Sequence, residues 1–259
     1  MIEDVKNGYE NVIVADAGNF LFRRSGIFPT SEEEDKIAAG LVSRGLSEMG
    51  YDVVNVGPND LAAGLDFLTE LRDEYALPLV SANLLSVDTL LPVFDAFMIV
   101  EMGGVSVGFV GVMGGGTSGA HDFDTFLITD PVDAVSATIS KIEDQCDLVV
   151  VLAAMDRHDA YDLADETDGI DLIITTSEPQ PLPIPMAVGD AVMVSADEKG
   201  KRVARVTIRM AADGPADFDT EMIPAGSLVT RHREVREIEN EFYYWLKEHN
   251  PSSVVLDPN

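Results

Sequence analysis

The chain has 259 residues, enough for one large domain, and 46% of them are hydrophobic, so a sizeable core can form. Its 17 lysines and arginines stand against 46 aspartates and glutamates, a net charge of −29. This charge argues against nucleic acid and anionic membrane surfaces as partners. Proteins bind both of these through Lys and Arg side chains, which are few here. The charge fits a solvated acidic surface, bound metal cations, a cationic partner or a salty habitat.

The single cysteine, Cys146, excludes an intrachain disulfide and a thiolate cluster, and it is expected to be a small core residue. No apolar run is long enough to span a membrane, so we expect no membrane insertion. The first residues lack the pattern of a signal peptide. We therefore expect either a protein that stays inside the cell or one whose leader has been removed.

Apolar periodicity predicts the elements in chain order. A helix is expected over 32–49, with Ser31 as its N-cap and Gly50 at its end. Further helices are expected at 65–75, 131–143, 159–166 and 234–248. Short apolar runs predict strands at 11–15, 52–56, 79–82, 97–101, 105–112, 148–153, 172–175, 191–195 and 203–210.

Turn signals and strand order then suggest the topology. Gly103-Gly104 predicts a hairpin, and residues 197–200 predict a turn between the last two strands. Strands that alternate with helices in the first half predict a mainly parallel sheet with right-handed crossovers. The second half adds antiparallel hairpins, so a pair of mixed sheets with helices outside fits better than a doubly wound fold.

Six segments carry recognisable motifs, in order and with sensible spacing. They are Val14-Ala-Asp-Ala-Gly-Asn-Phe-Leu-Phe, Gly50-Tyr-Asp-Val-Val-Asn-Val-Gly-Pro-Asn-Asp-Leu, Leu77-Pro-Leu-Val-Ser-Ala-Asn, Gly103-Gly-Val-Ser-Val-Gly-Phe-Val-Gly-Val, Asp147-Leu-Val-Val-Val-Leu-Ala-Ala and Gly169-Ile-Asp-Leu-Ile-Ile-Thr-Thr-Ser-Glu-Pro. Together they resemble the calcineurin-like phosphoesterase domain of 5'-nucleotidase and UDP-sugar hydrolase type metallophosphoesterases. The similarity covers roughly residues 11–248. It implies an α/β fold, the four-layer α/β/β/α sandwich with mixed sheets.

The resemblance also implies a site of two metal ions, which clamp a phosphate and activate a water. The family's ligands are His, Asp and Asn, and each recognisable ligand position is altered here. Asn19 replaces the bridging Asp, Pro58 and Asn59 replace an Asn-His pair, Ala154 replaces a His, and Ser177 and Pro179 replace two more. The family's opening Asp-x-His pair has no counterpart. We therefore expect no catalytic residue, no metal centre and no cofactor of the family's kind.

The resemblance also bears on domains and compartment. We expect a single domain over 1–259, with a core of about 11–230 and a C-terminal helix at 234–248. The family's C-terminal substrate domain is expected to be absent, and with it the aromatic grip on a nucleobase. Members are commonly periplasmic or extracellular, whereas this chain shows no leader, so the compartment stays open.

Other polar residues offer weaker candidates. In the cleft that corresponds to the family's active site, we expect three polar residues to remain: Asp16, Asp60 and Asn83. Asp156 and His158 lie among carboxylates, and they indicate either a replacement metal site or an exposed helix start.

Two further segments have alternative interpretations. The Gly-rich run 114–119, with His121 downstream, indicates an anion-binding turn or an ordinary loop. The helix at 234–248 carries consecutive aromatics that pack on the domain or form a partner surface.

The leading hypothesis is a degenerate, non-catalytic domain, a pseudoenzyme that acts as a binding or assembly module, with an unknown protein partner or a second copy of itself. The alternative is a metal-dependent phosphoester hydrolase with rearranged ligands drawn from Asp16, Asp60, Asp156 or His158, which would contain Mn or Zn.

Overall fold

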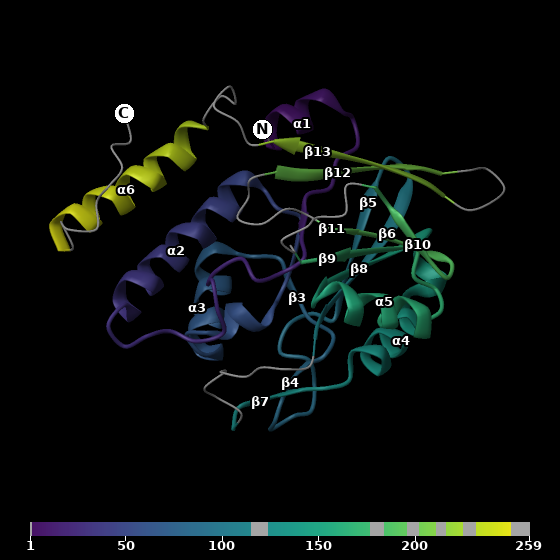
Figure 1. The fold of residues 1–259 in the computed structure, drawn as a ribbon, viewed down its shortest axis with the longest axis horizontal. Coiled ribbons are helices and arrows are strands. Elements are labelled where there is room, and N and C mark those ends of the chain that lie inside the picture. Colours follow the sequence, from purple (N-terminus) through teal and green to yellow (C-terminus); the bar gives the residue numbers. More distant parts are fainter. Residues whose placement is uncertain are drawn as a thin grey trace.

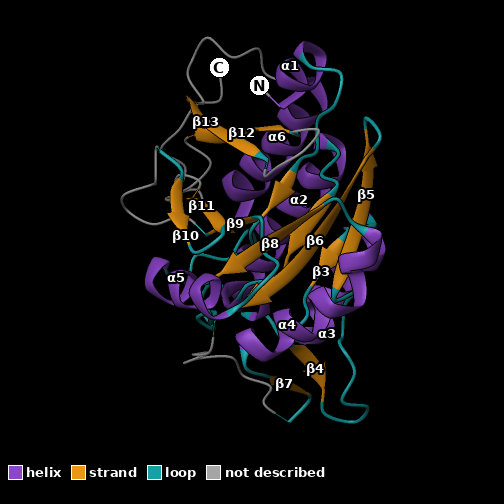
Figure 2. Cartoon of the chain, turned by 90° about the vertical axis from the view of Figure 1, so that its right-hand side faces the viewer, coloured by secondary structure: helices purple, strands orange, loops and turns teal. Residues whose placement is uncertain are grey.

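The computed structural model describes residues 2–114, 124–176, 184–195, 202–210, 216–224 and 232–249. Its elements form four layers, helix–sheet–sheet–helix (Figures 1 and 2). Helices α2 (Glu32–Met49), α3 (Leu65–Tyr75) and α6 (Arg233–His249) lie on the left of Figure 1, and α4 (Pro131–Ile142) and α5 (Arg157–Glu166) lie on the right. The two sheets lie between these helices, which confirms the predicted α/β/β/α sandwich.

The inner layers are a small sheet and a large sheet. In the small sheet, β1 (Ala15–Asp16), β2 (Val53–Asn55) and β3 (Leu79–Val80) are parallel neighbours. The large sheet has the order β10-β11-β9-β8-β6-β5, with parallel inner strands and antiparallel edge strands. Its strands are β5 (Phe97–Met102), β6 (Val105–Met113), β8 (Leu148–Ala154), β9 (Leu172–Thr175), β10 (Met186–Val188) and β11 (Ala191–Ser195).

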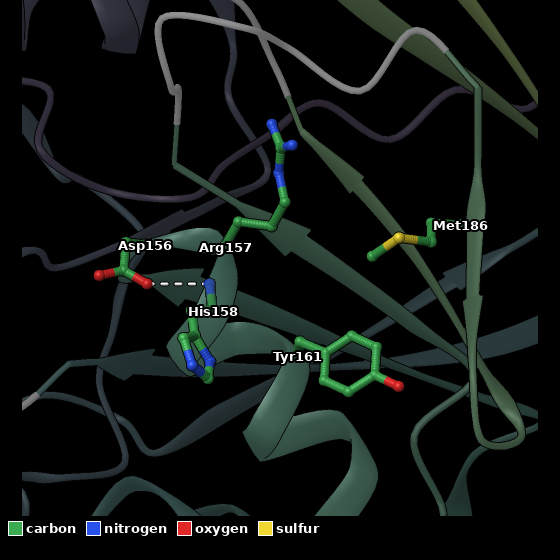
Figure 3. A pocket seen from close by; sticks show the side chains of 5 residues that line it. All are labelled: Asp156, Arg157, His158, Tyr161 and Met186. Atoms are coloured by element: carbon green, nitrogen blue, oxygen red, sulfur yellow. Dashed lines mark hydrogen bonds between the residues drawn. The ribbon is translucent and has the colours of Figure 1, made fainter.

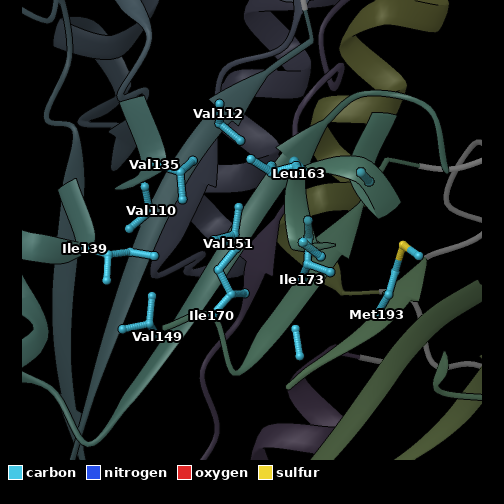
Figure 4. Packing of buried hydrophobic residues seen from close by; sticks show 14 of the residues in the cluster. Val110, Val112, Val135, Ile139, Val149, Val151, Leu163, Ile170, Ile173 and Met193 are labelled. Carbon is cyan, nitrogen blue, oxygen red and sulfur yellow. The ribbon is translucent and has the colours of Figure 1, made fainter. Parts of the chain in front are cut away.

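Three hydrophobic cores hold the layers together. Successive strand residues point to opposite faces, so each buried strand contributes to two of these cores. Val150 of β8 faces the small sheet and shares a core with Val53. Its neighbour Val149 faces the outer helices and shares a core with Ile139 of α4 (Figure 4). The third core lies between the small sheet and helices α2 and α3, and includes Leu68.

The two sheets approach each other closely at Gly111 of β6. A Cβ atom there would lie 2.5 Å from Asn55 Oδ1 and 2.6 Å from the carbonyl oxygen of Val80, so only glycine permits the contact. Asn55 is fully buried, and its amide donates hydrogen bonds to the carbonyl oxygens of Ala17 and Val112, at 3.0 and 2.9 Å. One side chain therefore joins the loop after β1 to the end of β6.

Helix α2 begins and ends where the periodicity predicts. Gly50 adopts a left-handed conformation with φ of 64°, and it terminates the helix as expected. The Ser31 hydroxyl does not cap the helix, because it bonds the Asp35 carboxylate at 2.7 Å instead of a backbone amide. Helix α6 packs against α2, and Arg44 forms a bidentate ion pair with Glu241. Among the described residues, no helix has the length and apolar character to cross a bilayer.

Several short elements were not predicted. The patterns missed α1 (Ile2–Gly8), β4 (Leu84–Ser86), β7 (Phe126–Ile128), β10 and β13 (Asp217–Pro224). β4 and β7 form an antiparallel ribbon at the bottom of both views. β12 (Arg202–Arg209) pairs with β13 as a second ribbon, whereas β11 joins the large sheet beside β9. The turn expected at 197–200 lies outside the described residues.

The strand expected at 11–15 is wrong over most of its length, because only Ala15 belongs to β1. A side chain takes the place of a strand partner there. The backbone amide of Val14 donates to the Asp52 carboxylate at 2.8 Å, and the amide of Asp52 donates back to the carbonyl of Val14. Asp52 therefore diverts the segment from a regular ladder.

Candidate functional site

The loops that follow β1, β2 and β8 meet at the carboxyl ends of these strands, the usual position of sites in α/β folds. Asn19 Oδ1 accepts a hydrogen bond from the backbone amide of Asn59 at 2.9 Å. A Cβ atom built on Gly18 would lie 3.1 Å from Cβ of Ala154. The structure thus brings together Asn19, Pro58, Asn59 and Ala154, and we call this region the strand-end site.

Asp60 lies at the centre of the strand-end site, in the 3-10 turn η1 (Pro58–Leu61) that follows β2. Its Oδ2 accepts hydrogen bonds from the backbone amides of Asn19 and Gly57, both at 2.8 Å. Its Oδ1 accepts one from the amide of Leu21 at 2.9 Å. The side chain is fully buried. This arrangement, the Asp60 clamp, fastens the loop after β1 to the turn after β2, and it places the Asp60 side chain inside the protein.

Two carboxyl groups of this region have unusual acidity. Burial, and to a smaller extent the nearby charge of Asp16, raise the pKa of Asp60 to about 7 against the opposing effect of its three amide donors. Asp16 follows the same pattern, because loss of solvation raises its pKa to about 6 despite a hydrogen bond from Gly18. The strand-end site therefore holds two carboxyl groups with raised pKa values, of which only Asp16 is partly exposed.

The backbone of the strand-end site is shaped around Asn19, which has a positive φ of 63°. Asparagine tolerates this left-handed conformation better than most residues. Gly57 provides the space beside it, because a Cβ atom there would lie 2.4 Å from Asn19 Oδ1 and 2.7 Å from its backbone nitrogen. The side-chain amide of Asn19 thus fills the space between the loop after β1 and the turn after β2.

Asn83 is a structural neighbour of the strand-end site. It is fully buried, and its amide donates to the carbonyl oxygens of Met113 and Thr129, at 2.8 and 3.1 Å. Its Oδ1 accepts from the amide of Met113, which lies opposite Ala154 in the large sheet. Asn83 therefore fixes the end of β6, with all its side-chain atoms engaged by backbone.

The resemblance implies a pair of metal ions here, and the described residues do not fit such a pair. The side chains of Pro58 and Ala154 have no ligand atom, and the one amide oxygen of Asn19 already accepts from Asn59. Both oxygens of Asp60 bind backbone amides. Within the described ranges, no group of three His, Cys, Asp or Glu side chains has the arrangement of a metal site.

Asp156 and His158 lie at the start of α5 instead. Asp156 caps this helix, since its carboxylate accepts from the amides of His158 and Asp159 at 2.9 and 3.0 Å (Figure 3). The His158 ring is 83% exposed, and its Nδ1 lies 3.2 Å from Asp162 Oδ2. A hydrogen bond to its own main chain and the Asp162 charge raise the pKa of His158. These two residues, with Tyr161 and Met186, line a shallow surface hollow.

Three expected site residues lie outside the described residues, namely Ser177, Pro179 and His121. Most of the Gly-rich run 114–119 lies there as well. The structure does place Thr176, which precedes Ser177, beside the end of β8, where its hydroxyl donates to the carbonyl of Met155 at 3.1 Å.

The sequence patterns missed two residues that shape the strand-end site, Asn55 and Gly57. A signal for Asn55 was available, because a polar residue within the apolar run Val53–Val56 indicates a buried amide with backbone partners. Gly57 gave no comparable signal, since its need for space arises from Asn19, a residue 38 positions earlier in the chain.

No known family's sequence profile matches the chain, and no curated protein sequence matches it. Solved structures do resemble it. The sulfate thiohydrolase SoxB of Thermus thermophilus superposes with a TM-score of 0.80 at 19% identity, over 96% of this chain and 46% of that one. The calcineurin-like phosphoesterase YfkN of Bacillus subtilis gives 0.76 at 20% identity, over 96% and 87%. A 5'-nucleotidase precursor from Thermus thermophilus gives 0.78 at 18% identity, over 95% and 52%.

The chain thus spans about half the length of SoxB and of the 5'-nucleotidase precursor. At these identities the likeness concerns the fold alone, and it agrees with the layer order. The chain has the metallophosphoesterase fold of the 5'-nucleotidases.

Proposed function

We propose that this chain is a non-catalytic metallophosphoesterase-like domain, which acts as a binding or assembly module. The fold family's chemistry needs two cations held by shared carboxylate, imidazole and amide ligands. The strand-end site keeps the backbone framework for this chemistry and directs its polar side chains to other uses.

The observation that carries the proposal is the Asp60 clamp. A carboxylate that accepts three backbone hydrogen bonds has little remaining capacity to hold a cation, and its full burial excludes a phosphate ester from it. Without a metal-bound water, hydrolysis lacks both its nucleophile and several kcal/mol of electrostatic stabilisation, roughly 3 or more.

A second candidate function is a hydrolase with rearranged ligands. One observation favours it: Asp16 and Asp60 are close enough for the charge of Asp16 to raise the pKa of Asp60. Two neighbouring carboxylates at strand ends are a common beginning of a divalent cation site. This function would require Asp60 to leave its three amide donors, at considerable cost in stability.

Metal analysis and a phosphatase assay separate the two candidates. The protein is purified, incubated with Mn²⁺ or Zn²⁺, desalted, and measured by inductively coupled plasma mass spectrometry. Hydrolysis of 5'-AMP and of bis(p-nitrophenyl) phosphate is then followed with added Mn²⁺. We expect well under one metal ion per chain and no turnover above the buffer rate.

The matched variants are Asp60→Ala and Asp156→Ala, which remove one carboxylate from the interior and one from the surface. Stoichiometric metal together with turnover that Asp60→Ala abolishes and Asp156→Ala leaves intact would overturn the proposal. Turnover that only Asp156→Ala abolishes would instead place a replacement site at the start of α5, and it would equally contradict a non-catalytic role.

A further inference from the structure

A cavity of about 240 Å³ lies beside the β12–β13 ribbon and α1, which are close together in the upper part of Figures 1 and 2. Its lining comes from α1 with Tyr9, from the residues 11–15 that lead into β1, and from residues 203–208 of β12. Ten of the fourteen lining residues are apolar, and none of the four residues that define the strand-end site is among them. We call this space the edge cavity.

The edge cavity runs between the edges of two extended segments. Successive side chains of such a segment point to opposite faces. Ile13 and Ala15 pack against the core between the two sheets, and so do Val206 and Ile208 of β12. Their neighbours in the sequence, which point to the opposite face, line the cavity as well. Because consecutive residues of both segments line it, the cavity lies along their edges and not on one face.

Neither edge has a strand partner on the cavity side among the described residues. The small sheet ends at β1, and β12 pairs with β13 alone. The carbonyl of Val14 accepts from the amides of Asp52 and Val53, at 2.8 and 3.4 Å, so it faces β2. Backbone groups alternate in direction along a strand, so those of Ala15 point away from β2. An unpaired strand edge is a template for the backbone of another strand.

The charge of the lining indicates the chemistry of an occupant. Arg205 is the only charged residue of the fourteen, and it already forms an ion pair with Glu221 and donates to the hydroxyl of Tyr9. Its Nε is buried and has no hydrogen-bond partner in the described part of the chain, so it is available to a carbonyl oxygen. The lining therefore suits an uncharged occupant. A second copy would instead bring another net charge of −29.

We propose that the edge cavity receives an extended, uncharged segment of another protein, which inserts as a strand between β1 and β12. The segment would have about four to six residues, the length of the two lining edges. Apolar side chains lie on both faces of the gap, and strands in such a position are runs rich in Val and Ile. The inserted backbone would join the ribbon and the small sheet into one continuous sheet.

The fold can admit such a strand without breaking a sheet. The β12–β13 ribbon pairs with no other described strand, so no ladder of hydrogen bonds has to open when the ribbon moves. The proposal gives the proposed binding role a partner class, and it uses no residue of the strand-end site.

Synthetic peptides test the insertion, with fluorescence anisotropy as the measurement. The probe is a labelled peptide with a Val-Ile-Val-Ile-Val run between Gly-Ser flanks. Two comparison peptides carry N-methyl groups on alternate residues, one on the odd positions and one on the even positions, so each loses the N–H donors of one edge. A strand bonded on both sides should lose about tenfold in affinity with either methylated peptide. A strand added to a single edge would be weakened by only one of them.

Variants then locate the binding. Val12→Ser with Val203→Ser removes apolar contacts from both sides of the cavity and should weaken the peptide about tenfold. The matched control is Ile99→Ser with Val100→Ser in β5, which is also half-buried and forms the free edge of the large sheet. This control should bind as the native protein does.

Hydrogen exchange of the native protein provides a readout that needs no substitution. With saturating peptide, amides within residues 13–15 and 203–208 should exchange about tenfold more slowly, because new backbone hydrogen bonds protect them. Amides of β5 should exchange at an unchanged rate.

Four results would overturn the proposal: no binding of the unmethylated peptide, weakening by only one methylated peptide, equal weakening in the β5 control, or unchanged exchange at both edges. Phosphatase activity would contradict the proposed function and leave these binding results unchanged, so the two failures are distinguishable.

Discussion

Two groups of polar residues at the carboxyl ends of strands differ in how the fold uses them. The loops after β1 and β2 enclose Asp60, and three backbone amides donate to its carboxylate. The segment after β8 presents Asp156 and His158 to solvent, where the aspartate only caps α5. The buried group holds two loops together, while the exposed group begins a helix.

The difference shows that a carboxylate at the end of a strand does not by itself indicate a metal-binding or catalytic site. Both regions contain carboxylates at the carboxyl ends of strands, yet within the described residues neither belongs to a group of three side chains that could hold a metal ion. In the strand-end site the Asp60 carboxylate accepts hydrogen bonds from backbone amides. At the start of α5 the carboxylates are spread over an exposed surface. Substitutions in the two regions should therefore have very different effects on stability.

The largest expected effect is that of Asp60→Ala. The substitution leaves three buried amides without an acceptor, and each unsatisfied donor is costly, so we expect a loss of about 3–4 kcal/mol in the free energy of unfolding. Urea denaturation at neutral pH measures it. A loss below about 1 kcal/mol would show that the loops find other partners and that the clamp is not what holds them.

Gly57→Ala should come next. The new Cβ atom would lie 2.4 Å from Asn19 Oδ1 and 2.7 Å from the Asn19 backbone nitrogen, so the loops must separate. We expect a loss of about 2–3 kcal/mol in thermal or urea unfolding. Gly45→Ala is the control, because nothing lies within 4 Å of its Cβ position and α2 should gain about 0.5–1 kcal/mol. Equal effects of the two substitutions would contradict the close contact.

The pH dependence of stability tests the burial of Asp60. Its pKa is about 7 in the folded protein, above the ordinary value of 3.8. Between these values the folded state binds more protons than the unfolded state, so stability falls as pH rises through this window. We expect Asp60 to contribute a slope of up to about 1.3 kcal/mol per pH unit. Asp60→Asn should flatten the curve by that amount, and parallel curves for variant and native protein would contradict the shift.

The smallest effect is expected for Asp156→Ala. The carboxylate accepts two amide hydrogen bonds at an exposed helix start, a typical N-cap, so its loss should cost about 0.5–1 kcal/mol. Asp130→Ala, which removes the equivalent cap from α4, should cost the same. A much larger loss for Asp156 than for Asp130 would show that the start of α5 does more than begin a helix.

The comparison also shows how far sequence reasoning reaches. Helix α2 was predicted from Glu32 to Met49, and β9 and β11 from their apolar runs, because each depends on local periodicity and on nearby turn residues. The layer order followed from the alternation of strands and helices together with the resemblance. The short ribbons β4–β7 and β12–β13 were harder to predict, since their partners lie far along the chain and their strands are partly polar.

The sequence by itself predicted the helices and strands, because apolar periodicity is a local property. Its resemblance to the metallophosphoesterases implied the sandwich fold and led to the expectation that Asn19, Pro58 and Ala154 replace metal ligands. Only the tertiary structure decided the role of Asp60. Its three donors belong to residues 19, 21 and 57, and its burial depends on the packing of two loops from separate strands. A carboxylate becomes a ligand or a structural clamp according to which donors surround it, and that depends on contacts that no local pattern encodes.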